Sequence, residues 1–199
     1  MVMKLLIATH NRDKLSEIRA LLAGIKLEIL SLDEYPELPE VVEDRDTIEG
    51  NAAKKALETA IHSGICCLAD DTGLFIDALG GAPGVYAARF AGESCTYRDN
   101  RLKALDLLKD KADRKALFKT AAVLAAPDGI IAIRQGVVTG KITTQELGDQ
   151  GFGYDSIFEL DGTGKTYAQM DAEIKNEISH RALALKAILP ILKTLAQLD

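Results

Sequence analysis

Cysteine is scarce in this sequence, and the cysteines present lack the spacing of a structural site. The chain has three, Cys66, Cys67 and Cys95, of which two are adjacent. They follow no metal-ligand pattern, and an odd number makes a poor disulfide framework. This excludes a secreted domain held together by disulfides, and we expect the protein to work in the reducing cytoplasm.

The sequence also lacks an excess of basic residues. It has 24 lysines and arginines against 30 aspartates and glutamates, a formal net charge of −6 and a pI near 5.2. Surfaces that bind nucleic acid or anionic membranes need a basic face. We therefore expect neither partner, and an anionic substrate would require a locally basic pocket.

A long hydrophobic run is missing from the start of the chain. The apolar residues Met1–Ala8 give way to polar residues at 10–13, before a signal-peptide core or a membrane span is complete. We interpret this segment as a first β-strand.

The remaining composition is that of a globular protein. Hydrophobic residues make up 47% and charged residues 27% of the 199 positions, and we expect one domain over residues 1–199. Short apolar runs alternate with helical spacings, without repeats or a linker, so we predict an α/β fold with a mixed central β-sheet flanked by helices. Strands are predicted at 4–9, 27–30, 65–69, 74–78 and within 116–142, and helices at 15–22, 47–63, 98–108 and 179–198, the last kinked or restarted at Pro190.

Residues Thr9–Lys14 connect the first predicted strand to the first helix. A helix start offers unpaired N–H groups and a favourable dipole to a phosphate, and Lys14 adds a positive charge. Two simpler interpretations stay open: Asn11 is an ordinary N-cap, and Lys14 is solvated near Glu17.

Asp70 and Asp71 follow a predicted strand directly. Carboxylate oxygens suit magnesium, and one of the two could orient or deprotonate water. Alternation along a strand points neighbouring side chains apart, so the two aspartates should differ in role. The alternative is a simple Asx turn closed by Gly73.

Two later segments have the composition of a base-binding site. Residues 151–155 combine flexible glycines with two aromatics and a carboxylate, although such aromatics are often only packed. His180 and Arg181 place cationic donors at a helix start, where the dipole disfavours them, so an electron-rich partner is expected. Lys55 and Lys175 could each neutralise a phosphate oxygen.

Together these motifs resemble the inosine and xanthosine triphosphate pyrophosphatases, over about residues 4–185. The matching elements are Thr9, Asn11 and Lys14 (Thr/Ser-x-Asn-x-x-Lys), residues 50–56 with Asn51 and Lys55, residues 69–74 (Ala-Asp-Asp-Ser-Gly-Leu in the family), residues 152–155 (Phe-Gly-Tyr-Asp) and residues 175–182. Departures include Thr72 for the usual serine, Ser156 for proline and Gly50 for an acidic residue.

The resemblance implies an elongated, two-lobed domain with an active-site cleft between the lobes, and a homodimer. It implies hydrolysis of dITP, ITP and XTP to the monophosphate and pyrophosphate, with Asp71 as the catalytic carboxylate and as a ligand of Mg²⁺. Residues 42–46 depart from the family pattern, so the second metal carboxylate stays open, and we choose Glu43. Donors from His180 or Arg181 would pair with the 6-oxo group of the base and disfavour adenine. The expected substrate-binding residues are Thr9, His10, Asn11, Arg12, Asp13, Lys14, Lys55, Thr72, Phe152, Gly153, Tyr154, Asp155, Lys175, His180 and Arg181.

Three other functions are compatible with parts of this pattern. One is a related house-cleaning pyrophosphatase for other modified nucleotides. It is disfavoured by the combination of His180 and Arg181 with Phe152 and Tyr154, which favours purines. Another is a non-catalytic nucleotide sensor, which would not need Asp71. A plain structural or nucleic-acid-binding domain is disfavoured by the acidic balance.

Overall fold

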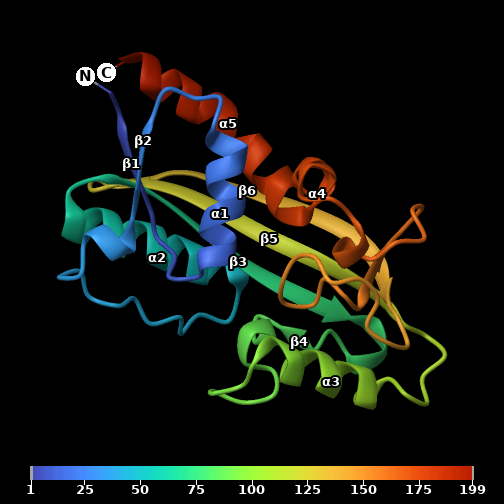
Figure 1. Cartoon of the computed structure of the whole chain (residues 1–199). Helices are drawn as coiled ribbons and strands as arrows, with labels where there is room; N and C mark the ends of the chain where they lie inside the picture. Colours follow the sequence, from blue (N-terminus) through green and yellow to red (C-terminus); the bar gives the residue numbers. More distant parts are fainter. Residues whose placement is uncertain (1, 199) are drawn as a thin grey trace. The chain divides into compact units, whose positions relative to one another are not determined.

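The computed structural model describes residues 2–198 and contains one mixed β-sheet with helices along it (Figure 1). The strand order is β2-β1-β3-β5-β6-β7, and β4 pairs with β3. The strands are β1 (Lys4–Ile7), β2 (Glu28–Ser31), β3 (Cys66–Ile76), β4 (Pro83–Gly84), β5 (Lys115–Ala126), β6 (Gly129–Ile142) and β7 (Phe158–Leu160). The helices are α1 (Arg12–Leu22), α2 (Ile48–Ser63), α3 (Tyr97–Leu107), α4 (Ala172–Ile178) and α5 (His180–Leu198).

The sheet is mixed, as predicted. Strand β1 runs parallel to both β2 and β3, whereas β4 is antiparallel to β3 and β7 is antiparallel to β6. Leu5, Leu6 and Ile7 are all fully buried, which explains why β1 appears in the sequence as a continuous apolar run rather than an alternating one.

The chain forms two compact units, and each has its own hydrophobic core. Unit 1 consists of the residues up to 71, residues 120–136 and the residues from 181 onward; unit 2 consists of residues 72–119 and 137–180. The core of unit 1 combines β1 with apolar side chains of α1 and α5, among them Ile18 and Ile188. The core of unit 2 includes Phe118, Phe158 and Tyr167. The predicted cleft stays a prediction.

The predicted break between strands 65–69 and 74–78 is wrong, and so is the alternative of an Asx turn closed by Gly73, because β3 continues from Cys66 to Ile76. Asp70 and Asp71 remain inside the strand since residues of the same unit compensate both carboxylates. Gly73 is also extended: a Cβ there would lie 2.7 Å from the Phe75 ring and 2.9 Å from the Gly84 carbonyl oxygen. Glycine is needed at this position for close packing and not for a turn.

The C-terminal helical region also differs from the prediction. Helix α4 precedes the expected helix, and α5 passes through Pro190 without restarting. Pro190 is exposed, while Leu185, Ile188 and Leu192 on the apolar face are fully buried and hold the helix against the core of unit 1. Packing of this face outweighs the lost backbone hydrogen bond at proline.

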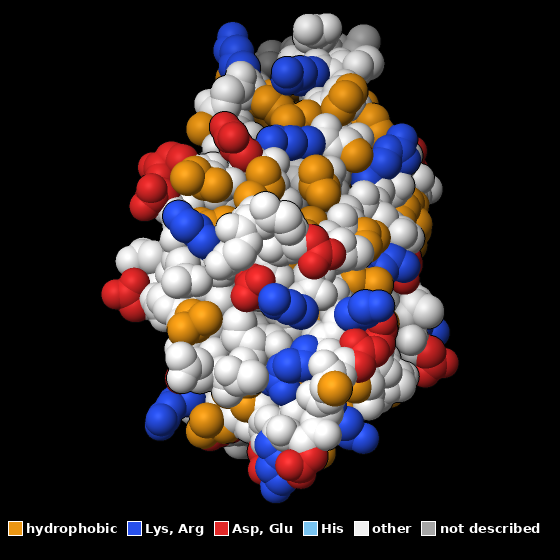
Figure 2. All heavy atoms as spheres, turned by 90° about the vertical axis from the view of Figure 1, so that its right-hand side faces the viewer, with side chains coloured by type: hydrophobic (Ala, Val, Ile, Leu, Met, Phe, Trp, Pro, Cys, Tyr) orange, Lys and Arg blue, Asp and Glu red, His pale blue; other side chains and the backbone are white. Residues whose placement is uncertain are grey.

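Within residues 2–198, none of the helices has the length and apolar character needed to cross a membrane. On the face shown in Figure 2, lysine and arginine side chains are interspersed with aspartate and glutamate rather than gathered into one basic stripe.

Candidate active site

Asn11 is the N-cap of α1. Its Oδ1 accepts hydrogen bonds from the backbone N–H groups of Asp13 (3.0 Å) and Lys14 (3.2 Å), and its own N–H donates to Thr9 Oγ1 (3.2 Å). The N-cap interpretation is therefore confirmed, and the cap occupies two N–H groups that the sequence had suggested for a phosphate. The segment also carries exposed side chains: His10, Arg12 and Asp13.

A buried ion network in unit 1 surrounds Asp70, whose side chain is fully buried. Lys14 Nζ lies 3.2 Å and Arg181 Nε 3.1 Å from Asp70 Oδ2. Arg181 Nη1 also donates to Glu17 Oε2. Lys14 is thus paired with Asp70 instead of solvated near Glu17, and the electron-rich partners expected for Arg181 are two carboxylates of the protein itself.

The network shifts the pKa values of its members. Burial alone would raise the pKa of Asp70, but the positive charges of Lys14 and Arg181 outweigh it and hold that pKa well below its usual range. Burial likewise lowers the pKa of Lys14, assisted by the neighbouring cations Lys55 and Arg181. Asp70 is therefore ionised at neutral pH, which suits a residue that positions a cation rather than one that exchanges protons.

Asp71 points to different partners, as alternation along the strand predicts. Its Oδ2 accepts a hydrogen bond from Asn51 Nδ2 at 3.2 Å, and only 6% of Asp71 is exposed. Asn51 Oδ1 accepts in turn from the backbone N–H of Arg45 at 2.9 Å. Gly50 allows this approach, because a Cβ there would lie 2.9 Å from Arg45 Cβ. The loop before α2 is thus fastened beside Asp71.

Lys55 links the two carboxylates expected at the metal. Its Nζ lies 2.5 Å from Glu43 Oε1. Burial would lower the pKa of Lys55, but the negative charges of Asp71 and then Glu43 raise it above the usual value. Lys55 therefore stays positively charged and interacts with two acidic side chains, each contributed by a different segment of unit 1.

The donor set fits a divalent cation that arrives with a nucleotide. Among residues 2–198 no group of three histidine, cysteine or acidic side chains could form a complete metal cage. Magnesium is usually held by one or two carboxylates together with substrate phosphates and waters. Asp71 and Glu43, whose charges both act on Lys55, are the two carboxylates of unit 1 that could hold such an ion.

In unit 2, residues 148–156 form a turn that we call the base loop. Asp155 Oδ2 accepts from the Phe152 N–H at 2.8 Å and lies 2.5 Å from Lys175 Nζ. Gly151, at φ +72°, has no room for a side chain, because a Cβ would lie 2.2 Å from Asp155 Oδ2. Lys175 Nζ also lies 4.7 Å from the centre of the Phe152 ring. The lysine is therefore compensated by Asp155 and stands beside a ring.

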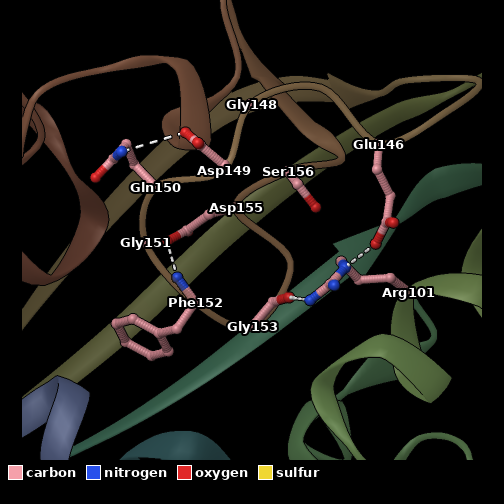
Figure 3. A pocket seen from close by; sticks show the side chains of 10 residues that line it. All are labelled: Arg101, Glu146, Gly148, Asp149, Gln150, Gly151, Phe152, Gly153, Asp155 and Ser156. Carbon is pink, nitrogen blue, oxygen red and sulfur yellow. Dashed lines mark hydrogen bonds and ion pairs between the residues drawn. The ribbon is translucent and has the colours of Figure 1, made fainter.

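A small pocket of about 140 Å³ adjoins this loop (Figure 3). Its lining residues are Arg101, Glu146, Gly148, Asp149, Gln150, Gly151, Phe152, Gly153, Asp155 and Ser156. Three of these residues, Phe152, Gly153 and Asp155, are among the substrate-binding residues that the sequence predicts. Arg101 and Glu146 are not among those predicted residues.

Two predicted base-binding residues are core residues in the structure. Tyr154 is 6% exposed, and its hydroxyl donates to the Ala87 carbonyl oxygen at 2.8 Å. Its role in binding the base stays a prediction. His180 is 4% exposed, and its ring stacks on Phe118 with centroids 4.4 Å apart. Thr72 is part of β3 and half-buried.

The sequence motifs contained Asn51 but gave it no role, and Glu17 appeared only as a possible surface partner. Both residues act through contacts between positions that are distant in the sequence. Asn51 and Asp71 are 20 positions apart, and Glu17 and Arg181 are 164 positions apart. A polar residue on the apolar stripe of a helix was the available signal for Asn51.

Known proteins resemble this chain over nearly its whole length. A dITP/XTP pyrophosphatase of Desulforamulus reducens is 44% identical over 195 residues, covering 97% of both chains. One of an Exiguobacterium species is 42% identical over 195 residues, covering 96% of this chain and all of the relative.

Solved structures give the same result. A HAM1 protein from Coxiella burnetii superposes with a TM-score of 0.88 at 34% identity, covering 96% of this chain and 99% of that one. A nucleoside-triphosphatase, also described as a dITP/XTP pyrophosphatase, from Mycobacterium abscessus has a TM-score of 0.75 at 40% identity, covering 94% and 100%. Since the model of the Ham1 family matches residues 5–191, this chain belongs to the Ham1 family.

Proposed function

We propose that this protein hydrolyses non-standard purine nucleoside triphosphates, namely dITP, XTP and ITP, to the monophosphate and pyrophosphate. The observation that carries the proposal is the arrangement in unit 1 of a nearly buried carboxylate, Asp71, whose charge interacts with a protonated lysine, Lys55. Relatives described as dITP/XTP pyrophosphatases support the substrate class.

Membership of the family implies a requirement for a divalent metal ion. We take this ion to be Mg²⁺, held by Asp71 and Glu43 together with the phosphates of the nucleotide. When bound there it supplies positive charge that offsets the charge of the phosphates.

Residues of unit 1 bind the phosphates and activate the attacking water. Lys14 and Lys55 bind the triphosphate and stabilise the negative charge that develops on the transferring phosphoryl group. Asp71 orients a water molecule and accepts its proton as the water oxygen attacks the α-phosphorus. Pyrophosphate then leaves, and the proton remains on the Asp71 carboxylate until it is released to solvent.

Recognition of the base is assigned to the base loop and Lys175. Phe152 offers a ring on which a purine can stack, and Lys175 places an ammonium donor 4.7 Å from the centre of that ring. An ammonium only donates, so it matches a 6-oxo group and opposes the 6-amino group of adenine. His180 and Arg181 as further donors stay predictions.

The test is pyrophosphate release from dITP, XTP, ITP, dATP and dGTP in the presence of Mg²⁺. We expect rapid release from the first three, and release from dATP slower by about one to two orders of magnitude, the consequence of one unpaired polar group. Equal turnover of all five would reject the selectivity, and no release from any of them would favour a nucleotide sensor.

We further propose that the protein is a homodimer and works in the cytoplasm. No disulfide joins the three cysteines within residues 2–198, which agrees with a reducing compartment. Light scattering of the purified protein would measure the mass of the particle in solution, and a monomer mass would reject the dimer.

A further inference from the structure

Arg101, in α3, lies outside every motif considered above and yet contacts the base loop. Its Nη1 donates to the Gly153 carbonyl oxygen at 2.9 Å, and its Nε donates to the Glu146 carboxylate. Figure 3 shows the guanidinium between these two oxygens. The Arg101 side chain is only 18% exposed. The guanidinium therefore joins α3, the base loop and the segment that follows β6.

A second contact comes from the same face of α3. Tyr97 stands one helical turn before Arg101, and its ring centre lies 5.9 Å from that of Phe152. The two α3 side chains thus contact consecutive residues of the loop, Phe152 by ring packing and Gly153 by a hydrogen bond.

The base loop needs such external contacts because its backbone is unusually free. Gly151 and Gly153 have φ angles of +72° and +60°, in the left-handed region that glycine tolerates. Glycine also leaves a wide range of other conformations accessible. The bond from the Phe152 N–H to Asp155 closes the turn from within, whereas Arg101 attaches it to a helix.

We propose that Arg101, oriented by Glu146, is a positioning residue that fixes the base loop so that Phe152 meets the purine ring. This inference rests on the proposed function. Lysine cannot replace arginine here, because one ammonium lacks the planar fork that reaches two differently placed oxygens.

The experiment compares Arg101→Lys with Arg98→Lys, which makes the same change at an exposed position of α3. Without nucleotide, amides of residues 148–156 should exchange hydrogen faster in Arg101→Lys than in Arg98→Lys. With dITP and Mg²⁺, the KM of Arg101→Lys should rise about tenfold while kcat changes less than about twofold, as for loss of one interaction made equally in the ground and transition states. Inhibition by inorganic tripolyphosphate, which has no base, should be unchanged.

Glu146 provides a further control. Glu146→Gln keeps an oxygen that accepts from Arg101 Nε, so its KM for dITP should stay near the native value. The KM of Glu146→Ala should rise as it does in Arg101→Lys. Unchanged exchange in Arg101→Lys, a KM equal to that of Arg98→Lys, or equally weakened tripolyphosphate inhibition would each overturn the inference. If the native chain released no pyrophosphate from dITP, the proposed function and the base-binding role would fall together, while faster exchange would still demonstrate the anchoring of the loop.

Discussion

Asn51 connects Asp71, the proposed catalytic carboxylate, to the loop that carries Glu43. It donates to Asp71 and accepts from the Arg45 N–H, and it is 1% exposed. We expect Asn51→Ala to lower the free energy of unfolding by about 1–3 kcal/mol, because buried polar groups lose their partner. Chemical denaturation measures this change.

The same residue offers a sharper comparison. In Asn51→Asp the new carboxylate can still accept from the Arg45 N–H, but it places a second negative charge against Asp71. We therefore expect pyrophosphate release to fall further in Asn51→Asp than in Asn51→Ala. Equal stability and activity in the native chain and both variants would contradict this role.

The lowered pKa of Asp70 predicts how the free energy of unfolding depends on pH. Its pKa is lowered in the folded chain, so its contribution to stability is fully present above the unfolded pKa of roughly 3.9 and is lost as the pH falls from there through the folded pKa. The free energy of unfolding should therefore decline less steeply in Asp70→Asn than in the native chain as the pH falls below about 4. Asp128→Asn, in an exposed turn, should keep the native slope.

Single residues were only partly predictable from the sequence. Asp71, Lys55 and Glu43 lie in one unit, where the charge of Lys55 interacts with both carboxylates, and their roles in the site stay predictions. The motifs did not distinguish Phe152, beside the pocket, from Tyr154, in the core, because neighbouring aromatics in a glycine-rich loop have the same composition whichever side they face.

At the scale of elements, a substitution of Gly73 tests whether close packing requires glycine at this position of β3. Gly73→Ala should lower the free energy of unfolding by about 1–3 kcal/mol, because the new methyl group would overlap Phe75 and the Gly84 carbonyl oxygen. Gly24→Ala is the matched control, since nothing lies within 4 Å of its Cβ position. Equal thermal stability of the two variants would contradict this packing.

The helices and short strands follow from local periodicity, and α1, α2 and α3 lie close to their predicted ranges. The continuous strand β3 could not be predicted from local periodicity, because two adjacent aspartates are typical of a turn. In the structure Lys14, Asn51 and Arg181 compensate these aspartates inside the strand. These partners come from three different helices or their flanks, and a local pattern does not contain them.

At the scale of the whole molecule, metal removal should separate activity from stability. Lys55 compensates Glu43 and Asp71 without any metal, so chelation should abolish pyrophosphate release while leaving the melting temperature nearly unchanged. Added Mg²⁺ should restore release. A large drop in melting temperature on chelation would show that the metal is structural instead.

The most direct measurement compares pyrophosphate release from dITP, with Mg²⁺, by the native chain, Asp71→Asn and Asp128→Asn. Asparagine at position 71 can still accept from Asn51, so the fold should persist while the water loses its base. We predict that kcat falls by about two to four orders of magnitude in Asp71→Asn and stays native in Asp128→Asn. Native turnover in Asp71→Asn would contradict the assignment of Asp71 as the catalytic carboxylate.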